Sequence, residues 1–209
     1  MVDTLWLFIN WTMRILNAEF VKSIVVYEGV NSDPLPEVCF IGRSNVGKSS
    51  MINSLVTRKI ARTSSTPGAT KLINLFNIYY ESKEERKSVL FSDFPGFGFS
   101  KVSRAVSKSW QAMIENYILK NKKIRTIIWL FDIRREIDEL DEMLIEWLLE
   151  NNLEFCVVLT KCDKETQSAI AKKKRLFDTY LNNRSVFTYS SKTGFGKREI
   201  LSYMANAIE

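Results

Sequence analysis

Nine residues from Gly42 to Ser50 have the types and spacing of a phosphate-binding loop. They follow the pattern G-x-x-x-x-G-K-[ST], in which two glycines let consecutive backbone N–H groups converge on an anion. The lysine of the pattern can reach the outer phosphate oxygens, and the serine hydroxyl after it can bind Mg²⁺. An apolar run at residues 38–41 and apolar residues at helical spacing in 50–56 predict the flanking strand and helix. The predicted phosphate-binding residues are Gly42, Arg43, Ser44, Asn45, Val46, Gly47, Lys48, Ser49 and Ser50.

Two tetrapeptides stand where later strands are predicted to end. Asp93-Phe94-Pro95-Gly96 follows the β-forming run 88–92, and Thr160-Lys161-Cys162-Asp163 follows the apolar run 155–159. The carboxyl ends of strands in an open α/β sheet meet at the edge that binds ligands. A carboxylate at position 163 can accept hydrogen bonds from N1–H and the 2-amino group of guanine, donors that adenine lacks at those positions. We therefore predict a guanine nucleotide, with guanine O6 facing the backbone N–H groups of Tyr189, Ser190 and Ser191.

Strands and helices are predicted to alternate along most of the chain. Further strands are expected at 72–80, 127–131 and 186–189, and helices at 102–119, 137–149, 167–181 and 197–208. In the helix at 137–149 we expect the acidic side chains to face outward, with Leu140, Leu144, Trp147 and Leu148 inward. This order predicts an α/β fold, a three-layer sandwich whose mostly parallel sheet has one antiparallel edge strand and helices on both faces. We expect one nucleotide-binding domain at residues 19–209, with residues 1–18 as a leader segment packed on it.

Composition limits the chemistry. The chain has 209 residues, 45% of them hydrophobic and 26% charged, which is ordinary for a single globular domain. It has no histidine, which excludes histidine-based acid–base catalysis and histidine-ligated metal sites. The three cysteines lack metal-ligand spacing and are expected in the core of a protein from a reducing compartment. The apolar run 5–9 is too short to span a bilayer, so we expect a cytoplasmic protein, with membrane-surface contact at 6–11 as the alternative.

Together these motifs resemble the translation-factor-like class of P-loop GTPases and, more closely, the EngB (YihA/YsxC) family of bacterial GTPases. The resemblance rests on residues 42–50, 66–70, 93–99, 132–135 and 160–163, and extends from about residue 19 to the C-terminus. It implies a cytoplasmic bacterial protein that hydrolyses GTP to GDP with Mg²⁺ as a molecular switch. It further implies that the protein assists assembly of the large ribosomal subunit and is needed for normal cell division and septation.

The resemblance also implies roles for individual residues. Thr70 is expected to report the γ-phosphate and Mg²⁺, with Thr66 in the same loop as the competing candidate. The Asp93 carboxylate is expected to hold Mg²⁺ through water, and the Gly96 N–H to sense the γ-phosphate. The implied nucleotide-binding residues of the 66–72 segment are Gly68, Ala69, Thr70, Lys71 and Leu72. The implied metal ligands are Ser49, Thr70 and Asp93, and the implied catalytic residues are Lys48, Thr70 and Gly96.

Phe97 stands directly after the D-x-x-G tetrapeptide, where Ras-like enzymes carry the glutamine that orients the attacking water. Its absence predicts slow intrinsic hydrolysis. Two roles stay open for Asn45. It either binds K⁺ beside the phosphates, as in related P-loop GTPases, or makes an ordinary loop hydrogen bond.

The net charge of +6 favours a polyanionic partner. Basic side chains cluster at 120–125 and at 172–175, and Arg134 and Arg135 lie between the clusters in sequence. Each cluster is either a solvated surface or a contact for the phosphates of ribosomal RNA. The expected partners are the RNA and proteins of the large ribosomal subunit, bound by a monomer, without DNA and without stable membrane insertion. A P-loop nucleotide or metabolite kinase or ATPase, or a membrane-associated GTPase, is the alternative function.

Overall fold

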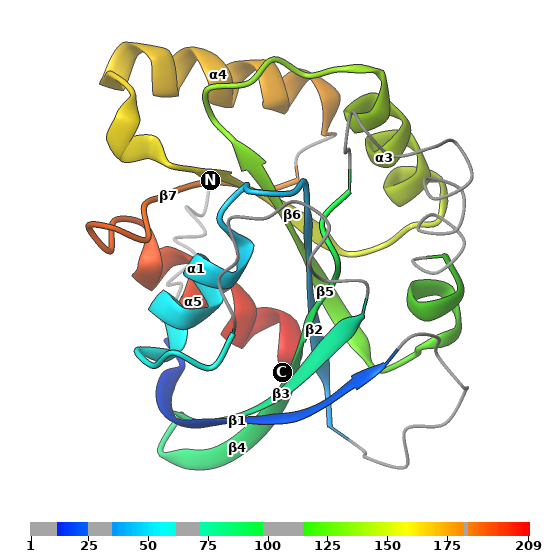
Figure 1. Ribbon diagram of the computed structural model, residues 1–209, viewed down its shortest axis with the longest axis vertical. Coiled ribbons are helices and arrows are strands. Elements are labelled where there is room, and N and C mark those ends of the chain that lie inside the picture. Colours follow the sequence, from blue (N-terminus) through cyan, green and yellow to red (C-terminus); the bar gives the residue numbers. More distant parts are fainter. Residues whose placement is uncertain (1–11, 25–34, 62–71, 98–114, 182–183) are drawn as a thin grey trace, which may run out of the picture.

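The computed structural model describes residues 12–24, 35–61, 72–97, 115–181 and 184–209. In this part of the chain, seven strands form one sheet in the order β1-β3-β4-β2-β5-β6-β7 (Figure 1). The strands are β1 (Arg14–Ile24), β2 (Glu37–Gly42), β3 (Ile73–Ser82), β4 (Glu85–Asp93), β5 (Ile124–Asp132), β6 (Phe155–Thr160) and β7 (Val186–Tyr189). The helices are α1 (Lys48–Val56), α3 (Glu139–Glu150), α4 (Gln167–Tyr180) and α5 (Lys197–Ile208), with a helical segment at residues 115–120 and a short 3-10 turn at Cys162–Lys164.

Strand direction confirms the predicted α/β fold class. Strands β4, β2, β5, β6 and β7 are parallel, and among the described strands β3 is the one that runs opposite to all the others. A hairpin joins β3 to β4 through Lys83 and Glu84, whose positive φ angles of 50° and 62° suit a tight two-residue turn. The strands predicted from the sequence are all present, although β4 and β5 each begin earlier than predicted.

The sequence did not predict β1 as a strand. It pairs antiparallel with β3, from Arg14 opposite Glu81 to Ile24 opposite Ile73, and therefore covers the outer edge of β3. The predicted boundary between residues 18 and 19 falls inside this strand. Buried and exposed residues do not alternate clearly along β1, because Ala18 is its one buried residue. The sequence therefore has no regular apolar pattern that would mark an inner face of this strand.

Helices cover both faces of the sheet, which gives three layers (Figure 1). Alternate residues of β2 point to opposite faces, so Val38 and Phe40 lie in one core while Cys39 and Ile41 lie in the other. The first core also contains residues of α1 and α5, and the second contains residues of α3, α4 and the 115–120 segment. Because β2 is packed from both sides, the loop that leaves it at Gly42 starts from a rigid position.

The three cysteines are buried free thiols, as predicted. Within the described ranges, every helix is too short or too polar to cross a membrane.

The predicted outward orientation of the acidic side chains in α3 is wrong at Asp141. This carboxylate is fully buried, whereas Leu140 is 44% exposed. Asp138 caps the helix by accepting hydrogen bonds from the Leu140 and Asp141 N–H groups, and Asp141 accepts one from the Asp138 N–H at 3.2 Å. Arg43 and Arg135 both form ion pairs with Asp141. These two partners compensate the loss of hydration that would otherwise exclude a carboxylate from the core.

A second buried carboxylate, Glu37, lies at the start of β2. It is 1% exposed and accepts hydrogen bonds from the Tyr117 hydroxyl at 2.6 Å and the Asn121 side-chain amide at 2.7 Å. Tyr117 belongs to the helical segment 115–120. The carboxylate therefore fastens the end of this segment to the strand that leads into the phosphate loop.

Replacing Glu37 by Ala is expected to lower the free energy of unfolding by about 3 kcal/mol, because two buried donors lose a charged acceptor. Glu37→Gln keeps one acceptor oxygen and should cost about half as much. Urea unfolding followed by circular dichroism measures both changes. Glu85→Ala, at an exposed carboxylate of the β3–β4 hairpin, is the control. An equal cost for Glu37→Ala and Glu85→Ala would contradict the assigned role of Glu37.

Candidate functional site

The carboxyl ends of five parallel strands meet at one edge of the sheet, which is where ligands bind in open α/β folds. These ends are Gly42 of β2, Asp93 of β4, Asp132 of β5, Thr160 of β6 and Tyr189 of β7. The ladder pairs Asp132 with Thr160 and Thr160 with Tyr189, so these ends are level with one another. Each predicted motif in the described ranges therefore begins at this same edge of the sheet, where the parallel strands end.

The phosphate loop leaves β2 at Gly42 and enters α1 at Lys48. A Cβ atom on Gly42 would lie 2.8 Å from the Leu130 carbonyl oxygen and 3.0 Å from a Val46 methyl carbon, so only glycine can pass between the loop and β5. The cap of α1 is Gly47, which has no side chain to occupy the N–H groups of the first turn. These N–H groups and the positive end of the helix can therefore bind an anion.

Lys48, Ser49 and Asp93 come together at the start of α1. The Lys48 ammonium forms an ion pair with Asp93 Oδ1, and the Ser49 hydroxyl lies 3.4 Å from Asp93 Oδ2. The ion pair is largely enclosed, with 10% of the Lys48 side chain and 5% of the Asp93 side chain exposed. A hydroxyl and a carboxylate are the hard oxygen donors that Mg²⁺ prefers. The residues present therefore fit a magnesium ion next to the phosphate loop.

The D-x-x-G tetrapeptide lies against the phosphate loop. The Ser44 N–H donates to the Phe97 carbonyl oxygen at 3.2 Å, and the Phe97 N–H donates to the Gly42 carbonyl oxygen at 3.3 Å. A Cβ atom on Gly96 would lie 2.8 Å from the backbone nitrogen of Ser44, which explains why glycine stands here. Phe94 and Pro95 are buried, so beyond the Asp93 side chain this segment meets the phosphate loop through its backbone.

The tetrapeptide predicted to bind the base is tied to the phosphate loop. The Thr160 hydroxyl donates to the Val46 carbonyl oxygen at 2.8 Å, and the Lys161 ammonium donates to the Asn45 carbonyl oxygen at 2.7 Å. These contacts join motifs that are more than a hundred residues apart in sequence. They hold the two ends of the site at a fixed separation.

Asp163 is exposed at the end of this tetrapeptide, whereas the Cys162 thiol is buried and burial raises its pKa. The Ser190 hydroxyl donates to Asp163 at 2.6 Å, and this hydrogen bond lowers the pKa of the Asp163 carboxyl. The N–H of Ser190 already donates to the Phe195 carbonyl oxygen at 3.1 Å, and the side chain of Tyr189 is in the core. Ser190 therefore meets the predicted base site through its hydroxyl, and Ser191 lies next to it in an exposed turn.

The sequence motifs did not assign Asp132 a role in the site. Its carboxylate accepts hydrogen bonds from Lys161 at 2.8 Å and from two nitrogens of Arg134 at 2.9 and 2.7 Å. Burial alone would raise the pKa of Asp132, but the hydrogen bonds from Arg134 and Lys161 outweigh burial and lower it. Asp132 therefore orients Lys161 along the phosphate loop. Its place at the end of a buried strand, like that of Asp93, is the signal that could have identified it.

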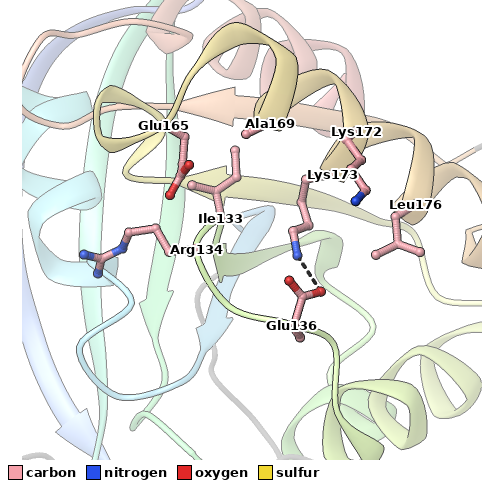
Figure 2. A pocket seen from close by; sticks show the side chains of 8 residues that line it. All are labelled: Ile133, Arg134, Glu136, Glu165, Ala169, Lys172, Lys173 and Leu176. Carbon is pink, nitrogen blue, oxygen red and sulfur yellow. Dashed lines mark hydrogen bonds and ion pairs between the residues drawn. The ribbon is translucent and has the colours of Figure 1, made fainter.

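A shallow groove of 250 Å³ lies between residues 133–136 and α4 (Figure 2). Lys173 crosses it, donating to the Arg135 carbonyl oxygen at 2.6 Å and pairing with Glu136 at 3.0 Å. Only 11% of the Lys173 side chain is exposed, so this lysine holds the 133–136 loop to α4. In the basic cluster at 172–175, by contrast, Lys172 and Arg175 are exposed.

Part of the predicted site lies outside the described residues. This applies to Thr66, Gly68, Ala69, Thr70 and Lys71, so the choice between the two threonines stays a prediction. Leu72, which is described, lies half-buried directly before β3.

Comparison with known proteins agrees with this geometry. Residues 37–161 match the family described as 50S ribosome-binding GTPase. A protein of Syntrophus aciditrophicus named "Probable GTP-binding protein EngB" is 41% identical over 197 residues, which cover 93% of this chain and 97% of the relative.

Solved structures share the fold. The crystal structure of a probable GTP-binding protein EngB has a TM-score of 0.64 at 24% identity, covering 82% of this chain and 98% of that one. The structure of Era in complex with MgGDPNP and a segment of 16S ribosomal RNA has a TM-score of 0.65 at 20% identity, covering 84% of this chain and 57% of that one. With the family match over residues 37–161 and a relative of this similarity, the chain belongs to the EngB family of GTP-binding proteins, within the P-loop GTPases.

Proposed function

We propose that this GTPase is a Mg²⁺-dependent switch in the bacterial cytoplasm that assists assembly of the large ribosomal subunit. The observation that carries the proposal is the contact between the D-x-x-G loop and the phosphate loop through Ser44, Gly96 and Phe97. A γ-phosphate next to the phosphate loop would meet the Gly96 N–H, and the chain that follows position 97 would respond to it. The description of the family supports a ribosomal partner.

In the proposed hydrolysis, Lys48 leaves Asp93 and neutralises charge on the outer phosphates, while first-turn N–H groups of α1 orient them. Ser49 and Thr70, with Asp93 acting through water, would hold Mg²⁺, and the ion would supply positive charge next to the phosphates. Phe97 is 7% exposed, and its side chain has no polar group that could orient water. Hydrolysis by the chain alone is therefore slow, and a partner accelerates it.

We assign contact with ribosomal RNA to the exposed basic side chains. Lys120, Lys122 and Arg125 lie near the start of β5, at the end of the sheet opposite the nucleotide site, while Lys172 and Arg175 lie on α4. The complex of Era with ribosomal RNA supports this type of partner for the fold. By the family resemblance, we also propose that the protein is needed for normal cell division and septation, which microscopy of cells depleted of it would test.

Two measurements test the proposal as a whole. Isothermal titration of the nucleotide-stripped protein with GTP, GDP and ATP is expected to show binding of both guanine nucleotides and at least about 10³-fold weaker binding of ATP. Sedimentation with ribosomal subunits is expected to retain the protein on the large subunit more strongly with a non-hydrolysable GTP analogue than with GDP. Equal retention with both nucleotides would contradict a switch, and equal affinity for ATP would contradict the base assignment.

Replacing Ser49 by Ala is expected to weaken GTP binding about 10-fold or more in the presence of Mg²⁺ and by much less in EDTA. The physical reason is that the serine hydroxyl contributes an oxygen to the metal rather than to the phosphates. Titration with a fluorescent GTP analogue under both conditions measures the difference. Ser168→Ala, at an exposed position of α4 outside the predicted site, is the control. Equal losses in Mg²⁺ and in EDTA would contradict the metal assignment.

Asn45 is proposed to bind K⁺ beside the phosphates. Its backbone has a positive φ of 60°, and its carbonyl oxygen accepts the Lys161 hydrogen bond, so the loop conformation is held while the side chain stays exposed. The turnover number for GTP is then expected to be several-fold higher in KCl than in NaCl at equal ionic strength, and Asn45→Ala should remove the difference. Equal turnover in the two salts would assign Asn45 to a loop hydrogen bond only.

A further inference from the structure

Arg43 is the second residue of the phosphate loop, but its side chain points to the start of α3. The guanidinium forms ion pairs with Asp138, which caps α3, and with Asp141, where the Nε–Oδ1 distance is 3.2 Å. Only 16% of the Arg43 side chain is exposed, and the Asp141 side chain is fully buried. The Arg43 guanidinium is therefore held at the start of α3 by its two ion pairs and points away from the phosphate loop.

A second arginine completes this cluster. Arg135 donates to Asp138 at 3.0 Å and to Asp141 at 3.1 Å, and its guanidinium lies 5.1 Å from the centre of the Phe131 ring on β5. Asp138 and Asp141 also hold each other through the capping box of α3. The capping box of α3 and the hydrogen bonds from Arg135 therefore hold the two carboxylates independently of Arg43. The carboxylates form a rigid anchor for the Arg43 guanidinium.

The same arginine contacts the D-x-x-G loop. The Arg43 guanidinium lies 5.8 Å from the centre of the Phe97 ring, and the backbones of Arg43 and Phe97 form a parallel bridge. Gly96, whose N–H is proposed to meet the γ-phosphate, precedes this bridge directly. One side chain therefore links three parts of the site: the phosphate loop, the D-x-x-G loop and the start of α3.

We propose that Arg43 is a positioning residue for GTP hydrolysis, and this inference rests on the proposed function. Its ion pairs with α3 hold the guanidinium under Phe97, and Phe97 in turn holds the Gly96 N–H at the place of the γ-phosphate. GDP lacks the γ-phosphate and is bound through the first-turn N–H groups of α1 and the Lys48 ammonium, groups that do not pair with Asp138 or Asp141. Arg43 therefore acts on the state that contains GTP and hardly at all on the state that contains GDP.

Replacing Arg43 by Met tests the proposal through this asymmetry. The turnover number for GTP is expected to fall about 10- to 100-fold, and the affinity for GTP to fall relative to that for GDP, whereas the affinity for GDP changes by less than about threefold. Arg43→Lys keeps the positive charge and can pair with one carboxylate, but it lacks the planar guanidinium that reaches both carboxylates and the Phe97 ring, so it should recover part of the turnover. A merely structural role would instead lower the turnover number, the affinity for GTP and the affinity for GDP together with the melting temperature.

Arg184→Met is the matched control, because Arg184 is also partly buried, pairs with Glu154 at 2.7 Å and lies 5.6 Å from the centre of the Phe155 ring. It stands before β7, away from the nucleotide edge, so the variant should keep the wild-type turnover. Asp141→Asn should give part of the Arg43→Met loss of turnover, because Asp138 still pairs with Arg43. The double variant should be no slower than Arg43→Met alone, because the Asp141 change acts on turnover through Arg43.

Multiplicative losses in the double variant, or equal losses of GDP affinity and turnover in Arg43→Met, would overturn the role of Arg43. An unchanged turnover number in Arg43→Met would overturn it as well. A wild-type protein that fails to bind or hydrolyse GTP would instead overturn the proposed function, so the two failures are distinguishable.

Discussion

Replacing Asp163 by Asn is expected to change the preferred base from guanine to xanthine. The carboxylate accepts two hydrogen bonds from guanine, and an amide in its place presents a donor to one of them, so GTP affinity should fall about 10³-fold. Xanthine carries an oxygen where guanine carries its 2-amino group, and the new amide donates to that oxygen. Titration of both proteins with GTP and XTP measures the exchange.

The structure shows that the substitution need not disturb the surrounding loop. Ser190 donates to one oxygen of Asp163, and the side-chain oxygen of Asn can accept the same hydrogen bond. Because that bond lowers the pKa of Asp163 below its ordinary value, the carboxylate of the wild type stays ionised between about pH 5 and 8, and guanine affinity should not follow its titration there. Asp178→Asn, at an exposed carboxylate of α4, is the control. A GTP loss without an XTP gain would contradict the assignment of Asp163 to the base.

Replacing Lys48 by Met is expected to reduce the affinity for GTP and GDP about 30- to 140-fold. The lysine is the charged donor that approaches the outer phosphates, and a charged hydrogen bond of this kind contributes about 2 to 3 kcal/mol. In contrast to Arg43→Met, the loss should affect both nucleotides, because the β-phosphate is common to them. Titration with fluorescent GTP and GDP analogues measures both affinities.

The variant also leaves Asp93 without its ion-pair partner in an enclosed position, so folding must be checked by its melting temperature. Lys87→Met is a suitable control, because Lys87 is ion-paired with Glu85 at 2.9 Å on the β3–β4 hairpin, away from the nucleotide edge. If Lys48→Met kept its affinity for both nucleotides while remaining folded, the loop at 42–50 would not be the phosphate site.

The nucleotide motifs were predictable because their chemistry is local. Gly42, Lys48 and Asp93 stand next to strands whose apolar runs are unmistakable, and the parallel sheet then brings the strand ends to one edge. The sequence also predicted three later elements to within one residue, because each has a clear hydrophobic pattern of its own. They are the helices at 167–180 and 197–208 and the strand at 186–189.

The rest of the fold depends on contacts that no local pattern carries. β1 becomes a strand because β3 offers an open edge, although its own side chains are mostly exposed. By its sequence context, Asp141 is expected to be a solvated helix residue. It is buried instead, and it accepts a hydrogen bond from Arg43, which lies almost a hundred positions earlier in sequence. Pairings of this kind are determined by the tertiary structure, so the direction in which the Arg43 side chain leaves its loop could not be derived from the sequence alone.

The contacts from Thr160 and Lys161 to the phosphate loop have a consequence for how a bound nucleotide leaves. Because Lys161 bonds Asn45 and Asp132 while Thr160 bonds Val46, the base end and the phosphate end can separate only when these hydrogen bonds break together. Spontaneous departure of a bound GDP is then expected to be slow, because separating the two ends requires the loss of several hydrogen bonds at once.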